Sequence, residues 1–178
     1  MPAPEPEASQ QERRLKFFIT APARARWPHE VRDLTPWVLG NLDQLGRKLG
    51  LTLNGARREV PVGTFRADIV ATDSSGRSVI IENQLGPSDH VHFGQVVLYA
   101  LASGADVIVW LVAVDLRSYI SGGLRPEHQQ ALERLNEVFA GKIEFYGVEV
   151  SLEPVPLRQA RSSPLLPVIK VIVKPNSS

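Results

Sequence analysis

The chain contains no cysteine among its 178 residues. This absence excludes disulfide bonds and thiolate zinc sites, and it is compatible with a reducing compartment. No apolar run approaches the length of about 18 residues that marks a membrane-spanning helix, so we expect none. The first residues, MPAPEPEASQQERR, lack the apolar core of a signal peptide. We therefore expect a cytoplasmic protein.

Neither sign of charge is in clear excess, because the net charge is only +1. The composition as a whole does not point to a nucleic-acid partner, although a local basic patch could still bind one. With 43% hydrophobic and 22% charged residues, the chain resembles an ordinary globular protein. Residues 1–14 are rich in Pro, Glu and Gln and are predicted to form a disordered tail, so we expect a single domain over residues 15–178.

Three helices are predicted from capping residues and apolar spacing. The first spans residues 35–49, with Thr35 as N-cap and Gly50 as the terminating residue. The second spans residues 89–103 with Ser88 as N-cap, and the third spans residues 125–140. The inner face of the third helix is predicted to carry apolar side chains: Ala131, Leu135 and Val138.

Six strands are predicted between and after these helices. They cover residues 51–63, 64–72, 77–84, 106–114, 142–155 and 166–175, with a loop at 159–164. The apolar run at 106–114 predicts a central strand that is covered on both faces. The order α-β-β-β-α-β-α-β-β predicts an α/β fold in which helices flank a mixed central sheet.

Polar residues interrupt the apolar pattern at the end of the third strand. If the DSSG turn before this strand is centred near residue 75, opposed positions sum to about 150, and Asp68 lies across from Glu82. Gln84 then shares the face of Glu82. The neighbouring residues should point to the other face: Ala67, Ile69, Ile81 and Asn83.

Two opposed carboxylates repel each other, so something must offset their charge. A divalent cation is one solution, since Mg²⁺ binds one or two carboxylates together with water and substrate phosphates. The alternative is that the carboxylates pair with Arg66, Arg58 or a lysine, or reach solvent at the strand ends. The spacing alone leaves both solutions open.

The motifs VGTFRADIVATD, IENQLGPSDHVHFGQVVLYA and LERLNE resemble a bacterial branch of the PD-(D/E)XK nucleases, which have the restriction-endonuclease-like fold. The resemblance implies that Asp68, Glu82 and the main-chain carbonyl of Asn83 bind Mg²⁺ or Mn²⁺. The family usually has lysine where this chain has Gln84. A glutamine carries no charge, but its amide can orient the attacking water.

The helix motif with Gln95 and Tyr99 resembles that of RecB-type nucleases. These two residues share a helix face with His92, and the resemblance implies that they contact the DNA backbone or a metal-bound water. Alternatively, Tyr99 is a core residue whose hydroxyl is hydrogen-bonded. Basic residues are expected to hold the backbone as well: Arg57, Arg58 and Arg66.

Other polar residues are weaker candidates. Some family members recruit a further acid, which would fit Glu59 as an additional metal ligand and Glu30 less well; a surface carboxylate is the favoured expectation for both. His90 and His92 diverge near a helix start, which argues against zinc, and Asp89 and His90 are expected to order the loop or to touch phosphate. Ordinary surface positions are expected for Asp115, Glu127 and His128.

The sequence therefore favours a metal-dependent nuclease that hydrolyses phosphodiester bonds, with DNA as the expected substrate. The alternative is a degenerate nuclease-fold module that binds nucleic acid or a protein partner without cleavage. Such a small enzyme should cut with little sequence preference unless it forms a homodimer or joins a larger complex. The apolar final strand offers one way to pair across a dimer.

Overall fold

We used a computed structural model, which describes residues 22–114, 123–154 and 165–176. The expected tail at residues 1–14, the loop at 159–164 and Asp115 lie outside the described residues. The elements follow one another in the predicted order, with two short additional turns before the first helix.

The first predicted helix forms as two pieces, α3 (Thr35–Gly40) and α4 (Leu42–Leu49). Helix α2 (Ala23–Arg26) and a π-helical turn, η1 (Glu30–Leu34), precede them. Gly50 ends α4 with a φ of 74°, a left-handed conformation that favours glycine. The assignment of Thr35 as N-cap is wrong, because η1 runs directly into α3 and the preceding Leu34 is already helical.

The six strands form one mixed sheet in the order β1-β2-β3-β4-β5-β6. The strands are β1 (Leu53–Val62), β2 (Phe65–Asp73), β3 (Ser78–Leu85), β4 (Val107–Ala113), β5 (Glu144–Pro154) and β6 (Leu165–Val173). Strand β4 runs parallel to both β3 and β5, whereas the other neighbouring pairs are antiparallel. Every residue of β4 is buried, which confirms the predicted central strand.

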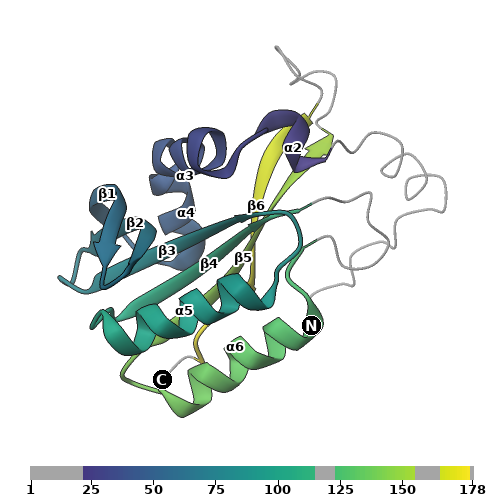
Figure 1. Cartoon of the computed structure of the whole chain (residues 1–178). Coiled ribbons are helices and arrows are strands. Elements are labelled where there is room, and N and C mark those ends of the chain that lie inside the picture. The colour runs from purple at the N-terminus through teal and green to yellow at the C-terminus, as the bar shows by residue number, and fades with distance from the viewer. Residues whose placement is uncertain (1–21, 115–122, 155–164, 177–178) are drawn as a thin grey trace, which may run out of the picture.

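Helices cover both faces of this sheet (Figure 1). Helices α2, α3 and α4 lie on one face, and α5 (His90–Ala102) and α6 (Pro126–Val138) lie on the other. The core is accordingly divided in two by the sheet: Trp27, Leu34 and Leu45 belong to one cluster, and Tyr99 and Leu132 belong to the other. The chain therefore has the expected α/β architecture of a mixed sheet flanked by helices.

The face that α6 turns to the sheet is only partly the predicted one, since Leu135 packs against the core but Val138 does not. Its buried residues are His128, Leu132 and Asn136, whereas Val138 is 60% exposed. The prediction considered only apolar residues, but Asn136 can be buried because it makes two hydrogen bonds with the backbone of Phe145, both 2.8 Å long. These bonds orient α6.

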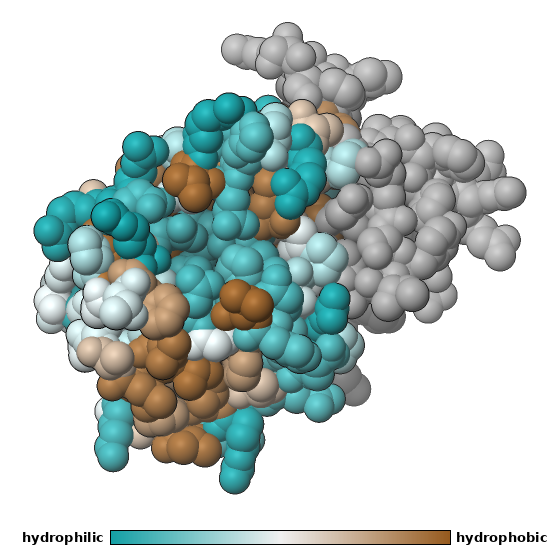
Figure 2. All heavy atoms as spheres, viewed as in Figure 1, coloured by the Kyte–Doolittle hydropathy of each residue, from teal (hydrophilic) through white to brown (hydrophobic). Residues whose placement is uncertain are grey.

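No helix in the described part of the chain is long and apolar enough to span a membrane. The described surface is mainly hydrophilic in the upper part of Figure 2, and apolar side chains gather at the lower left. Helix α5 contributes exposed apolar side chains at Val91, Leu98 and Leu101.

Candidate active site

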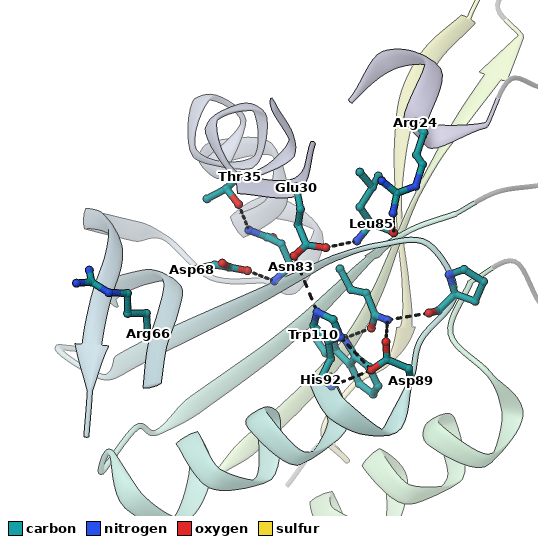
Figure 3. Close-up of polar contacts among 12 residues, drawn as sticks. Arg24, Glu30, Thr35, Arg66, Asp68, Asn83, Leu85, Asp89, His92 and Trp110 are labelled. Atoms are coloured by element: carbon teal, nitrogen blue, oxygen red, sulfur yellow. Dashed lines mark hydrogen bonds and ion pairs between the residues drawn. The ribbon is translucent and has the colours of Figure 1, made fainter. Parts of the chain in front are cut away.

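The candidate site lies where β2 and β3 cease to pair. Their ladder has the predicted register, with Ile69 opposite Ile81 and Val70 opposite Ile80, so that paired positions sum to 150. Beyond Ile69, β2 pairs with β1 alone. At this point a carboxylate oxygen of Asp68 accepts a hydrogen bond of 2.7 Å from the main-chain N–H of Asn83 (Figure 3). The Asp68 side chain therefore bridges the two strands where they separate.

Ala67 lies just beyond the end of the β2–β3 ladder. Strict alternation predicts that it shares a face with Ile69. Ala67 instead packs in the core cluster beneath α5 and α6, whereas Ile69 packs in the other cluster. The pairing of β2 with β1 stays in register from Phe65 to Val70, so no bulge there accounts for the difference.

Glu82 is buried beside Asp68 and is only 3% exposed. Within the described residues, its Oε2 atom has no hydrogen-bond partner. Burial and the charge of Asp68 raise the pKa of Glu82 to about 8. Burial, together with the charges of Glu30 and Glu59, raises the pKa of Asp68 to about 6, against the opposing hydrogen bond from Asn83. The ionised pair is therefore destabilised in this environment.

The basic residues considered as partners do not neutralise these carboxylates. Arg66 donates instead to the main-chain oxygen of Glu59, at 3.1 Å. Arg58 is exposed on β1, and no ion pair among the described residues joins an arginine or lysine to Asp68 or Glu82. The negative charge of the pair is thus left without a cationic side chain in direct contact.

Asn83 and Glu59 each bring a further oxygen to the surroundings of the pair. The Asn83 amide donates to the Thr35 hydroxyl at 3.2 Å, and its own Oδ1 has no partner among the described residues. Glu59 has a φ of 53°, which is unusual for a residue other than glycine, and its buried Oε1 also lacks a described partner. Strained backbone of this kind is often found at functional sites.

Glu30 was expected to be a surface carboxylate, and that expectation is wrong. The η1 turn directs its side chain toward the end of β3, where Oε2 accepts a hydrogen bond of 2.6 Å from the Leu85 main-chain N–H (Figure 3). Its charge contributes to the raised pKa values of both Asp68 and Glu82. Glu30 is therefore part of the acidic environment of the site.

His92 lies at the same site, in the first turn of α5. Its Nδ1 atom is 2.9 Å from an oxygen of Asp89, and its Nε2 atom is 3.9 Å from an oxygen of Glu30. Burial would lower the pKa of His92, but the interactions with Glu30 and Asp89 outweigh it and raise the pKa to about 9. The two neighbouring carboxylates therefore favour the protonated imidazole.

Asp89 is also the N-cap of α5, in place of the predicted Ser88. Its side chain accepts a hydrogen bond of 2.9 Å from the main-chain N–H of His92. Ser88 is fully buried and bonds instead to His128, at 2.7 Å. Asp89 was expected to order this loop, and the capping bond shows how it does so.

Gln84 uses both ends of its amide in contacts with the protein. Its oxygen accepts from the indole N–H of Trp110 at 3.1 Å, and its nitrogen donates to Pro87 at 2.7 Å and to Asp89 at 2.9 Å. The side chain is only 3% exposed. A water molecule would have to compete with these bonds in order to be oriented by Gln84.

Tyr99 is brought to the site by α5 and is only 1% exposed. Its hydroxyl donates a hydrogen bond of 2.7 Å to the main-chain oxygen of Arg66. Burial and the nearby charges of Glu82 and Asp68 raise the pKa of Tyr99. Interaction with Gln95, one turn earlier on the helix, opposes this rise in the pKa of Tyr99. The phenol therefore ties α5 to β2 beside the carboxylate pair.

His128 was expected at the surface but is only 2% exposed, so this expectation is wrong. Its Nδ1 faces the Ser88 hydroxyl, and its Nε2 is 3.0 Å from Nδ1 of His90. The ring packs against Phe93 and Trp110, and its pKa is lowered by burial and by His90. These contacts join the start of α6 to the start of α5. Glu127 is exposed, as expected.

The residues at the fork between β2 and β3 fit a divalent cation. The buried Glu82 and the partly buried Asp68, both with raised pKa values, and the unpartnered Glu82 oxygen form a donor set of the kind that Mg²⁺ prefers. No cluster of three or more His, Asp or Glu side chains with metal-binding geometry occurs within the described ranges. An ion would therefore need main-chain oxygens, water or substrate to complete its shell.

No family model matches this chain, and no curated protein matches it either. Among solved structures, it is similar to a repair endonuclease from Pyrococcus abyssi, with 17% identity over 56% of this chain and 42% of that chain and a TM-score of 0.41. It is also similar to EndoMS in a complex with double-stranded DNA, with 16% identity, coverage of 68% and 46%, and a TM-score of 0.42. A third similar structure is Pyrococcus furiosus SfsA in complex with Ca²⁺, with 14% identity, coverage of 80% and 63%, and a TM-score of 0.42. The chain thus spans less than two thirds of each of these chains, and the function proposed below rests on the residues of the site.

Proposed function

We propose that this protein is a metal-dependent nuclease of the PD-(D/E)XK superfamily that hydrolyses phosphodiester bonds, with DNA as its substrate. The observation that carries the proposal is the Glu82 carboxylate, which is 3% exposed, lacks a partner for Oε2 within the described residues and lies beside Asp68. A cation would offset the cost of this buried charge. Such an arrangement lowers the stability of the fold, and a ligand that binds there explains why it is present.

Asp68, Glu82 and the main-chain carbonyl of Asn83 would hold Mg²⁺ or Mn²⁺, and Glu59 would add a further oxygen. A bound ion would supply Lewis acidity, lowering the pKa of a water nucleophile and screening the charge that develops on phosphorus. The protein keeps the Glu82 carboxylate away from bulk water, which strengthens its electrostatic interactions. The hydrogen bond from Asn83 fixes the Asp68 carboxylate in place.

Basic and polar residues near the site would hold the DNA backbone. Arg57 and Arg58 are exposed on β1, and Arg66 is exposed on β2. Such side chains bind phosphate without reading sequence. Gln95 approaches from α5, whereas Tyr99 is a buried core residue with a satisfied hydroxyl that fixes the position of β2 and is not itself a backbone contact.

A second candidate function is nucleic-acid binding without cleavage. The neutral amide of Gln84 favours it, since that amide is occupied by Trp110, Pro87 and Asp89. The two functions differ in one property, which is the breaking of a phosphodiester bond.

A cleavage assay separates these functions. Linear, nicked and single-stranded DNA would be incubated with the protein in Mg²⁺, in Mn²⁺ or in EDTA. The nuclease proposal predicts metal-dependent products that disappear in Glu82→Gln and persist in the matched surface variant Glu133→Gln, since Glu133 is exposed on α6. DNA binding without products in either metal would favour the binding module and contradict the nuclease proposal.

A further inference from the structure

Phosphodiester hydrolysis requires positive charge near the reacting phosphate, because negative charge builds on it in the transition state. Gln84 cannot supply that charge. Its amide is neutral, and its oxygen and nitrogen are already bonded to Trp110, Pro87 and Asp89. Besides the bound ion, a positive side chain at the reacting phosphate would therefore come from another element of the fold.

The His92 imidazole is well placed to be this group. It approaches from the first turn of α5 and lies between Asp89 and Glu30 (Figure 3). The acidic groups that surround it come from four elements: Glu30 of η1, Asp68 of β2, Glu82 of β3 and Asp89 at the N-cap of α5. With its side chain 21% exposed, the ring is sheltered but open to a ligand.

One nitrogen of the ring remains available to a substrate. Nδ1 is committed to Asp89 at 2.9 Å. Nε2 is 3.9 Å from the Glu30 oxygen, which is an ion-pair separation and too long for a hydrogen bond. The Nε2–H group can therefore donate to a phosphate oxygen while Nδ1 keeps the ring in position.

Asp89 couples this ring to the rest of the site. One of its oxygens accepts from both the main-chain N–H and the Nδ1–H of His92, each at 2.9 Å. The other accepts from the Gln84 amide, also at 2.9 Å. A single carboxylate thus fixes the helix start, the imidazole and the Gln84 side chain relative to β3.

We propose that His92 supplies the cationic contact to the reacting phosphate and that Asp89 is the residue that positions it. This inference rests on the nuclease function proposed above, and it assigns the positive charge of that site. The raised pKa of His92, about 9, agrees with it. The ring would remain charged throughout the neutral range and would lose its proton only in alkaline solution.

The test compares His92→Gln, which removes the charge, with His92→Lys, which restores it. His29→Gln is the matched control, because His29 is an exposed histidine outside α5. We expect His92→Gln to lower kcat by about 100-fold, the usual effect of losing one electrostatic contact in a transition state. His92→Lys should recover most of this loss, and His29→Gln should match the wild type.

Asp89→Asn tests the positioning role, because asparagine also caps helices but carries no charge. This variant should lower the pKa of the His92 ring, followed by NMR, and move the alkaline limb of the pH–rate profile to lower pH by the same amount. A merely structural role for Asp89 would leave the alkaline limb of the pH–rate profile unchanged.

The outcomes separate this inference from the nuclease function. Two results would overturn the role of His92 and leave the nuclease function intact. One is a cleavage rate of His92→Gln within about 3-fold of the wild-type rate, and the other is failure of His92→Lys to restore the lost rate. Absence of cleavage by the wild type would overturn the nuclease function. In that case, binding of the same DNA in Ca²⁺ decides the matter: equal affinity of wild type and His92→Gln overturns the phosphate contact as well, and weaker binding by His92→Gln supports it.

Discussion

Glu82→Gln should make the protein without bound metal more stable at pH 8 and change its stability little at pH 5. The folded-state pKa of Glu82 is about 8, whereas its ordinary value is 4.5. Between these values the folded protein retains a proton that the unfolded chain has released, so stability falls as the pH rises through this window. Glutamine has the shape of the protonated acid and does not titrate.

The magnitude follows from the same two pKa values. The shift of the Glu82 pKa from 4.5 to about 8 corresponds to a loss of at most about 5 kcal/mol of folding stability, at about 1.4 kcal/mol per pKa unit. Relaxation of the site and entry of water should reduce this to about 2–3 kcal/mol. This is a large part of the stability of a typical domain.

Urea unfolding in EDTA at pH 5 and pH 8 measures this effect for the wild type and for Glu82→Gln. Glu133→Gln is the control for the same chemical change at an exposed position. The wild type should lose more stability than Glu82→Gln between the two pH values, and Glu133→Gln should follow the wild type. Equal losses in the wild type and Glu82→Gln would refute the argument that Glu82 is buried with a raised pKa.

Three further predictions concern the metal, the core and the link between α5 and β2. Mg²⁺ should raise the melting temperature more at pH 8 than at pH 5, because protons compete with the ion for Asp68 and Glu82; equal shifts in calorimetric scans would contradict a site on these carboxylates. Leu132→Ala should cost about 3 kcal/mol in urea unfolding, and Val138→Ala should cost less than about 0.5 kcal/mol; the reverse order would restore the α6 face first predicted. Tyr99→Phe should cost about 1 kcal/mol through loss of the hydrogen bond to β2, and unchanged stability would show that this bond contributes nothing.

The pairing of β2 with β3 could be predicted from the sequence because it depends on local chemistry. The DSSG turn sets the register, and a register error of one residue would move the apolar side chains of β3 to the wrong face. The prediction that paired positions sum to 150 is confirmed. The core cluster that Ala67 joins could not be predicted in this way, since Ala67 lies beyond the end of the β2–β3 ladder.

The orientation of α6 was predicted only in part, because the helix carries both apolar and polar side chains that can be buried. Of the predicted inner residues, Leu135 packs against the core and Val138 is exposed. The structure buries the face with Asn136 and His128, whose polar atoms are satisfied by partners on β5 and in the loop before α5. Sequence periodicity cannot reveal such partners, because they are distant in the chain.

The surroundings of the carboxylate pair depend on similar long-range contacts. Glu30 reaches the site through the η1 turn and binds the backbone of Leu85, 55 residues further along the chain. Gln84 has a predictable position on β3, but its bond to Trp110 depends on the pairing of β3 with β4, and its bond to Asp89 depends on where α5 begins. The sequence therefore indicated Asp68 and Glu82, and the structure was needed to find the groups around them.

The central claim, that Asp68 and Glu82 hold a divalent cation, is tested most directly by Mn²⁺ binding followed by electron paramagnetic resonance. The experiment would use the wild type, Asp68→Asn and the control Asp43→Asn, which changes an exposed aspartate on α4. We predict saturable binding by the wild type and the control, with affinity at least about 10-fold lower in Asp68→Asn. No binding by the wild type, or equal affinity in all three proteins, would contradict the account.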